Sequence, residues 1–138
     1  MTMREILFRG KHSKKSMWDY GDLYIDHDKV YICMRETMHG VRVHGEVIPE
    51  TVGQFTGLTD KNGTKIFEGD IVRAVLPKSN AIPEFVWPDM VVGFSEGAFS
   101  AMRGRYCTPL YSFAPAVELE VIGNIHDNPE LLEDKHHG

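Results

Sequence analysis

The fold is decided by residues 52–72, which read Val52-Gly53-Gln54-Phe55-Thr56-Gly57-Leu58-Thr59-Asp60-Lys61-Asn62-Gly63-Thr64-Lys65-Ile66-Phe67-Glu68-Gly69-Asp70-Ile71-Val72. Two extended segments flank a tight reversal at 60–63. The Asn-Gly pair within it reaches positive φ angles at little steric cost, which is why Asn-Gly marks hairpins. The stretch therefore predicts a β-hairpin with Gly63 at positive φ, followed by a central strand over 70–76.

Short strands are also predicted on both sides of this hairpin. The clearest is 41–47, where Val41, Val43 and Val47 share one face, so we expect a half-buried strand. The best helix start is Asn128 as N-cap with Pro129 at N1, and that helix is a turn or two long. Many short strands with almost no helix predict an all-β fold, a small barrel or sandwich. The other expected strands cover 6–8, 17–25, 30–33, 90–94, 98–102 and 117–121.

Composition fits one ordinary globular domain. The chain has 138 residues, of which 42% are apolar, and two cysteines, Cys33 and Cys107, which we expect to be free thiols. No window approaches the roughly 18 apolar residues that span a bilayer, so we expect no membrane association. The N-terminus lacks a hydrophobic signal region of adequate length, so we expect a cytoplasmic protein.

Charge is unevenly distributed along the chain, whose net charge is −5. Residues 1–15 hold five basic side chains and one acid, a balance of +4, whereas 116–138 hold six acids and one lysine, a balance of −5. A basic N-terminal arm is able to meet phosphate, so a nucleic-acid-binding accessory protein is one alternative. A dedicated nucleic-acid binder usually has a basic domain, and solvated or mutually complementary ends are the simpler interpretation.

Three blocks of sequence resemble the YopX family of phage and prophage proteins. They appear in family order at 3–10, 52–72 and 120–132, and together bracket nearly the whole chain. The resemblance implies an all-β core related to SH3-like barrels and a phage or prophage gene in a bacterial host. It implies no biochemical activity and no catalytic residues. The region 77–115 fits the family pattern least well.

We therefore expect a single YopX-like domain over 1–138. Residues 1–48 would form an N-terminal β extension and 49–138 an SH3-like barrel core. Five of the seven prolines fall between Pro77 and Pro115, and they frame a long loop at 77–88. Long ordered loops on a rigid scaffold are a usual place for function.

No motif predicts catalysis, a metal site or a cofactor. Gly93-Phe94-Ser95-Glu96-Gly97 matches the G-x-S-x-G nucleophile elbow, but a strand rather than a helix is predicted to follow it. The 60–64 stretch lacks the glycine and glutamate positions of a calcium loop, and no histidine spacing is typical of a zinc pair. We expect no enzyme, no metal and no cofactor.

Candidate binding residues are aromatic and basic. Phe85 and Trp87 share the proline-framed loop, and large rings of this kind either pack in the core or serve an interface. Trp18 and Tyr20 share one strand face. Arg103 and Arg105 are basic side chains beside Tyr106. These six residues lead us to expect a non-enzymatic protein-binding or self-assembling module, with a protein partner or a homo-oligomer as the leading assembly.

Overall fold

A computed structural model describes residues 3–133, with the backbone alone for 36–38. It contains two antiparallel sheets and three short 3-10 turns, with 55% of residues in strands and 8% helical. The predicted all-β class with an SH3-like barrel is confirmed, because one sheet curls into a half-barrel. No helical turn within 3–133 has the length and apolar content that a membrane-spanning helix needs.

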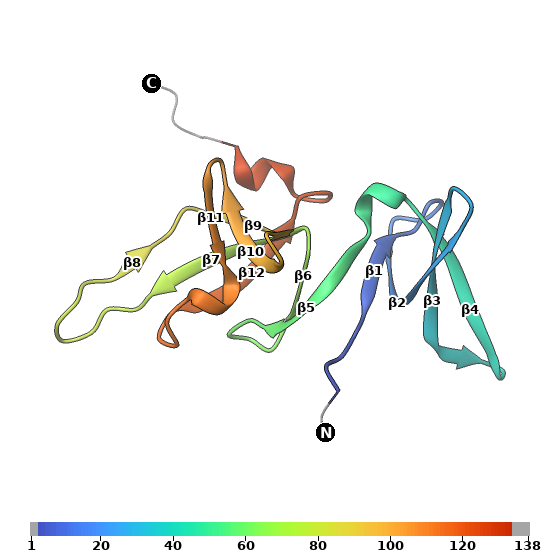
Figure 1. Ribbon diagram of the computed structural model, residues 1–138, viewed down its shortest axis with the longest axis horizontal. Coiled ribbons are helices and arrows are strands. Elements are labelled where there is room, and N and C mark those ends of the chain that lie inside the picture. Colours follow the sequence, from blue (N-terminus) through green and yellow to red (C-terminus); the bar gives the residue numbers. More distant parts are fainter. Residues whose placement is uncertain (1–2, 134–138) are drawn as a thin grey trace. The chain divides into compact units, whose positions relative to one another are not determined.

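The chain divides into two compact units, Met1–Gly57 and Leu58–Gly138, each described by itself. The division falls after Gly57 inside a strand, whereas we expected an N-terminal extension that ends at 48. Figure 1 follows the elements in chain order, and their bounds are β1 (Phe8–Lys11), β2 (Trp18–Asp26), β3 (Lys29–Met38), β4 (Val41–Val47), η1 (Pro49–Thr51), β5 (Gly53–Thr59), β6 (Lys65–Phe67), β7 (Asp70–Leu76), β8 (Phe85–Val86), β9 (Met90–Ser95), β10 (Ala98–Arg103), β11 (Tyr106–Pro109), η2 (Leu110–Ser112), β12 (Glu118–Asn124) and η3 (Pro129–Leu132).

The first unit holds neighbouring strands in the order β4-β3-β2-β1-β5, and β5 continues past Gly57 toward β6. β2 changes partner along its length: Trp18 to Gly21 pair with β1, and Asp22 to Asp26 pair with β3. Gly21 stands at the change, where a side chain would overlap the Cys33 carbonyl oxygen, so the backbones approach closely because this residue is glycine.

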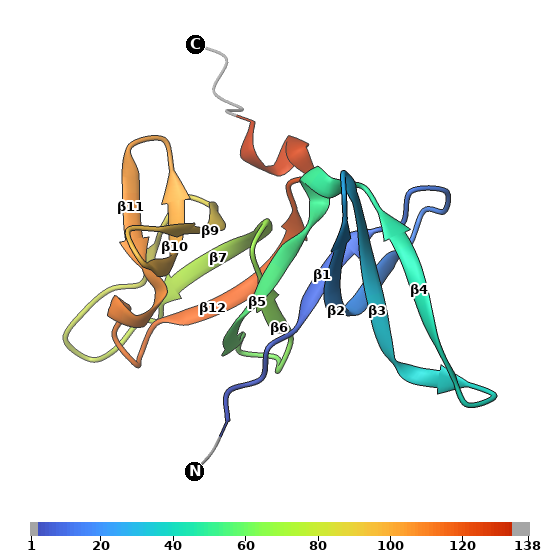
Figure 2. The same cartoon turned by 45° about the vertical axis from the view of Figure 1, so that its right-hand side comes forward.

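The expected half-buried face of β4 is wrong at its first residues. Val47 is buried at 1% exposure, but Val41 is 65% exposed and Val43 is 37% exposed. The period of two is present, yet β3 leaves β2 after Cys33 and pairs with β4 alone as far as Met38. The β3–β4 hairpin therefore extends beyond the rest of its sheet, as Figure 2 shows, and its valines there lack a covering strand.

The second unit curls around one apolar core. Its sheet has the order β11-β10-β9-β7-β12, and β8 pairs with the end of β7. As predicted, 70–76 is the central strand. The core is lined by residues from β6, β7, β9, β10 and η2, namely Ile66, Val72, Ala74, Met90, Val92, Ala101 and Leu110.

The predicted hairpin at 60–63 is confirmed, with Gly63 at φ 82°. Asp60 closes it: its carboxylate accepts hydrogen bonds from the backbone N–H groups of Asn62, Thr64 and Val121, each at 2.9 Å. The first two bonds fix the turn and the third joins it to β12. A residue that faintly resembles a calcium ligand is thus saturated by backbone donors.

Two expectations at the chain ends need correction. The first strand lies at 8–11 rather than 6–8, because pairing with β2 begins only at Phe8. Pro129 does begin a short 3-10 turn, but Asn128 makes no side-chain cap to it. The Asn128 side chain instead accepts a hydrogen bond from the Asn124 backbone N–H at 3.2 Å and fixes the preceding loop.

Candidate aromatic groove

A groove of about 380 Å³ in the second unit brings together three of the six predicted binding residues. We call it the aromatic groove, and it is lined by Phe85, Trp87, Pro88, Met90, Arg103 and Tyr106. Phe85 is 51% exposed and Tyr106 is 49% exposed, whereas Met90 is 1% exposed and forms part of the core. Partly exposed rings therefore stand over a buried floor.

β-Strand register positions these side chains. Phe85 lies opposite Leu76 in the β7–β8 pair, so the long loop is tied back to the central strand just before Trp87. Arg103 lies opposite Tyr106 in the β10–β11 pair, and directly opposed residues project from the same face of a sheet. Two short pairings thus carry the aromatic and basic side chains to one place.

The two loop rings, which the sequence could assign either to the core or to an interface, differ in their surroundings. Trp87 packs against the core and meets Phe113 edge to face, with ring centroids 5.6 Å apart. Phe85 meets Trp87 edge to face at 4.7 Å and leaves half of its surface exposed. Trp87 is therefore held in place by its contacts with the core and Phe113. Phe85 is the ring that a partner can reach.

Arg103 supplies the charge of the aromatic groove. Its Nη1 donates a hydrogen bond to the backbone oxygen of Asp89 at 2.8 Å, which orients the guanidinium. The carboxylate of Asp89 pairs with a different arginine, with its Oδ1 3.4 Å from Arg73 Nε. The remaining guanidinium donors of Arg103 have no partner among residues 3–133. Arg105, also predicted as a binding residue, is exposed and does not line the groove.

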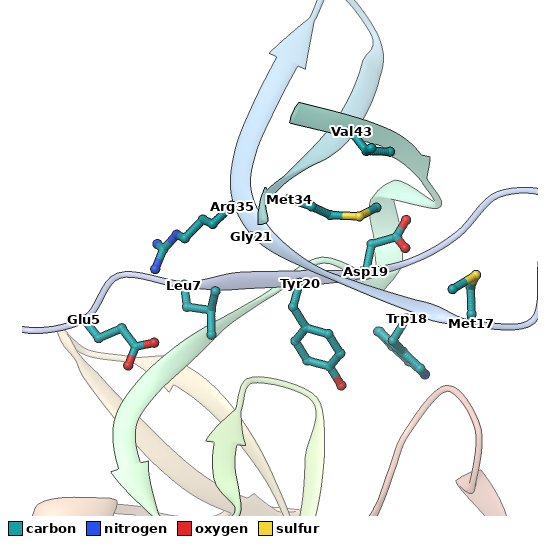
Figure 3. A pocket seen from close by; sticks show the side chains of 10 residues that line it. All are labelled: Glu5, Leu7, Met17, Trp18, Asp19, Tyr20, Gly21, Met34, Arg35 and Val43. Atoms are coloured by element: carbon teal, nitrogen blue, oxygen red, sulfur yellow. The ribbon is translucent and has the colours of Figure 1, made fainter. Parts of the chain in front are cut away.

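Trp18 and Tyr20 belong to a different groove in the first unit, of about 570 Å³. Figure 3 shows its lining, with Trp18 and Tyr20 on one side of β2 and Asp19, Met34 and Val43 toward the other. We call it the Asp19 groove. The guanidinium carbon of Arg9 lies 4.8 Å from the Trp18 ring centroid, a cation–π contact, and Arg9 is only 6% exposed.

A cross-strand row beside the Asp19 groove was missed by the sequence pattern. Asp22, Cys33 and His44 are register partners across β2, β3 and β4, and the Cys33 Sγ lies 3.6 Å from the His44 Nε2. Hydrogen bonds from Arg42 and then Arg35 hold the pKa of Asp22 below its usual range. The separate strands were predictable, but the register that joins them includes a bulge that alternation alone does not reveal.

Ser95 and the histidines are further side chains that the sequence singles out for chemistry. Ser95 pairs with Ala98 in a tight β9–β10 hairpin, with Glu96 and Gly97 both at positive φ. A strand follows it, so the strand-to-helix geometry of a nucleophile elbow is not formed. Within the described part of the chain, no three His, Cys, Asp or Glu side chains are grouped to hold a metal ion.

Similarity to known proteins agrees with this architecture. A crystal structure described as protein EF1440 from Enterococcus faecalis matches with a TM-score of 0.55 and 24% sequence identity, over 95% of this chain and 100% of that one. At this identity the likeness shows the fold alone. No curated protein matches the chain.

The family match is broader than any single motif. The family model described as YopX protein matches residues 7–133, which cover most of both compact units, the lining of the aromatic groove and all of the Asp19 groove except Glu5. This confirms the resemblance that the three sequence blocks carry. The chain belongs to the YopX family.

Proposed function

We propose that this protein is a non-enzymatic protein-binding module whose aromatic groove takes an extended segment of a partner protein. The observation that carries the proposal is the pair of half-exposed rings, Phe85 and Tyr106, over a floor that includes buried Met90. Aromatic and arginine side chains are the residues that most often dominate binding energy at interfaces. Anchoring Trp87 against the core reduces the entropy that ordering it would cost on docking.

The lining also indicates what the partner segment carries. Phe85, Trp87, Pro88 and Tyr106 favour an apolar or proline side chain, as in other grooves that dock extended peptides on aromatic surfaces. The unused donors of Arg103 favour a carboxylate next to it. The resemblance implies a phage or prophage gene, so a phage or bacterial protein is the partner class that we propose.

Nucleic acid is the weaker alternative. It rests on the basic N-terminal arm, and Arg9 of that arm is only 6% exposed over Trp18. Phosphate contacts would make the affinity fall steeply as salt rises. A mobility shift with an oligonucleotide at increasing salt separates this alternative from peptide binding.

The test compares groove and non-groove variants against an array of synthetic peptides that place proline or an aromatic residue next to an acidic one. Binding is read from Trp87 fluorescence in a Trp18→Phe background. We expect wild type to bind a subset of peptides and Phe85→Ala with Tyr106→Ala to weaken that binding about tenfold or more. Tyr111→Ala is the matched control, because Tyr111 is 79% exposed and lies outside the groove.

Self-association is checked on the same proteins by sedimentation. If wild type sediments as an oligomer and only the double variant shifts toward the monomer mass, the partner is a second copy of this chain. Equal peptide binding by the double variant and wild type, at equal stability, would contradict the proposal. The double variant avoids Trp87, whose truncation would cost about 3–5 kcal/mol of folding stability and confuse the result.

A further inference from the structure

The Asp19 groove contains a buried carboxylate that the fold leaves unsatisfied. Asp19 is 3% exposed, and its Oδ2 has no hydrogen-bond partner among the described residues. Buried polar groups in native proteins are nearly always hydrogen-bonded, and a buried charge is paired or neutralised. An unsatisfied buried carboxylate of this kind requires a hydrogen-bonding or charged partner from outside the folded chain.

The surroundings of Asp19 keep its carboxylate in place. Asp19 lies opposite Gly10 in the β1–β2 pair, and a side chain at position 45 would overlap Oδ2. Glycine at 45 therefore leaves the space that the carboxylate occupies. Burial raises the pKa of Asp19, and the charges of His12 and Lys15 oppose that rise. A cation that enters the groove would relieve the cost of burying this charge.

The charges that line the groove favour a cation. Two carboxylates, Glu5 and Asp19, line it against one guanidinium, Arg35. Arg35 is already committed, because it binds Asp22 at 2.9 Å and donates to the Ile6 backbone oxygen. His12 accepts a hydrogen bond at Nδ1 from the Lys14 backbone N–H. His12 and Lys15 thus lie close enough to influence Asp19, but neither donates a hydrogen bond to its Oδ2.

The remaining lining is apolar and adaptable. Met34 and Val43 lie on the same side of β2 as Asp19 (Figure 3), and Met17 also lines the groove, close to Trp18. Unbranched methionine side chains adapt to the shape of an alkyl chain. A compact ammonium on an alkyl stem can pair with a single carboxylate oxygen beside apolar side chains. A planar guanidinium binds a carboxylate best when both oxygens are accessible.

We propose that the Asp19 groove binds the ammonium group of a primary alkylamine, with the charge at the Asp19 carboxylate and the alkyl chain against Met34 and Val43. The site lies in the first unit and does not depend on the aromatic groove. A lysine side chain and a free alkylamine offer the same chemistry. The experiment distinguishes them.

The test titrates isotopically labelled full-length protein with n-butylammonium chloride and follows the amide signals of Gly21 and Gly45. Parallel titrations use n-butanol, sodium chloride at equal ionic strength, and Nα-acetyl-lysine N-methylamide. We expect saturable shifts with the two amines only. Tighter binding of the lysine derivative would identify a partner's lysine as the natural ligand, and equal binding would identify a free amine.

Two variants and one wild-type measurement decide the outcome. Asp19→Asn should weaken amine binding about tenfold or more, and exposed Asp28→Asn should leave it unchanged. In wild type, the carboxyl carbon of Asp19 should titrate at lower pH when the amine is present, which tests the site even if Asp19→Asn misfolds. Absence of saturable shifts, equal shifts with n-butanol, or an unmoved Asp19 titration would overturn the proposal.

Discussion

Replacing Asp60 should lower the stability of the second unit far more than is usual for a residue in a surface turn. The side chain is 7% exposed and accepts three backbone N–H bonds of 2.9 Å. Asp60→Ala removes all three acceptors. A buried donor left without an acceptor costs about 1–3 kcal/mol.

The magnitude follows from where the three donors lie. The Val121 N–H lies in β12 at a half-buried residue, so water replaces its lost acceptor less than it does at exposed Asn62 and Thr64. We therefore expect Asp60→Ala to lower the free energy of unfolding by about 2–4 kcal/mol. Asp60→Asn keeps one acceptor oxygen but points an amide donor at another donor, so its loss should be intermediate.

The assay uses the placement of the two tryptophans, one in each unit. In a Trp18→Phe background, Trp87 fluorescence during urea unfolding reports on the second unit. Glu84→Ala, on the exposed part of the 77–88 loop, is the matched control and should change stability by less than about 0.5 kcal/mol. A loss below about 1 kcal/mol for Asp60→Ala would refute the reasoning, because it would mean that the three bonds are replaced at no net cost.

Acid provides an independent check on the same residue. Burial alone would raise the pKa of Asp60, but the N–H bonds from Val121, Thr64 and Asn62 outweigh it and hold the pKa below 3.8. A carboxyl whose folded pKa lies below its unfolded value stabilises the fold above that unfolded value, and the contribution is lost as pH falls through the folded pKa. Wild type should therefore lose more stability than Asp60→Ala between neutral pH and about pH 3.

Three further predictions concern a turn, a serine and the thiols. Gly63→Val should cost about 1–2 kcal/mol in the same assay, because a β-branched residue resists φ of 82°, and an unchanged melting temperature would count against the turn. Ser95→Ala should leave folding and peptide binding intact, and covalent labelling of Ser95 by a fluorophosphonate probe would reopen an enzymatic function. Exposed Cys107 should be alkylated by iodoacetamide faster than buried Cys33, and faster labelling of Cys33 would show that His44 activates its thiol.

Local sequence signals predicted the strands and turns better than they predicted which strands pair and in which register. The 60–63 turn, the 41–47 strand and the 95–97 hairpin each rest on a few adjacent residues, and the structure contains all three. The exposure of Val41 depends instead on where β3 leaves β2, which alternation within one strand does not encode. Strand register is a property of two segments together.

The candidate site was predictable only in part for the same reason. Prolines and large rings marked Phe85 and Trp87, and the basic turn marked Arg103. Their meeting with Tyr106 requires the β7–β8 and β10–β11 pairings. Asp19 falls in a run of acids, with Asp22, Asp26 and Asp28, that the sequence predicts to be solvated, and for Asp19 this is wrong. Its burial depends on glycine at 45, distant in sequence.

The loop at 124–128, between β12 and η3, bears on how members of the family should be compared. Asn124 accepts hydrogen bonds from the backbone N–H groups of His126 and Asp127, so this part of the family pattern serves chain reversal. The aromatic groove is built from residues within 85–106, inside the region 77–115 where we expect the family pattern to be weakest. Met90 is both the floor of the aromatic groove and part of the core, whereas Phe85 and Tyr106 are half-exposed above it. An exchange of surface positions such as 85 and 106 between two members of the family should therefore change binding preference, whereas an exchange of all of 77–106 would also replace core residues of the host. Within this family, a shared fold is compatible with partners that differ from one protein to the next.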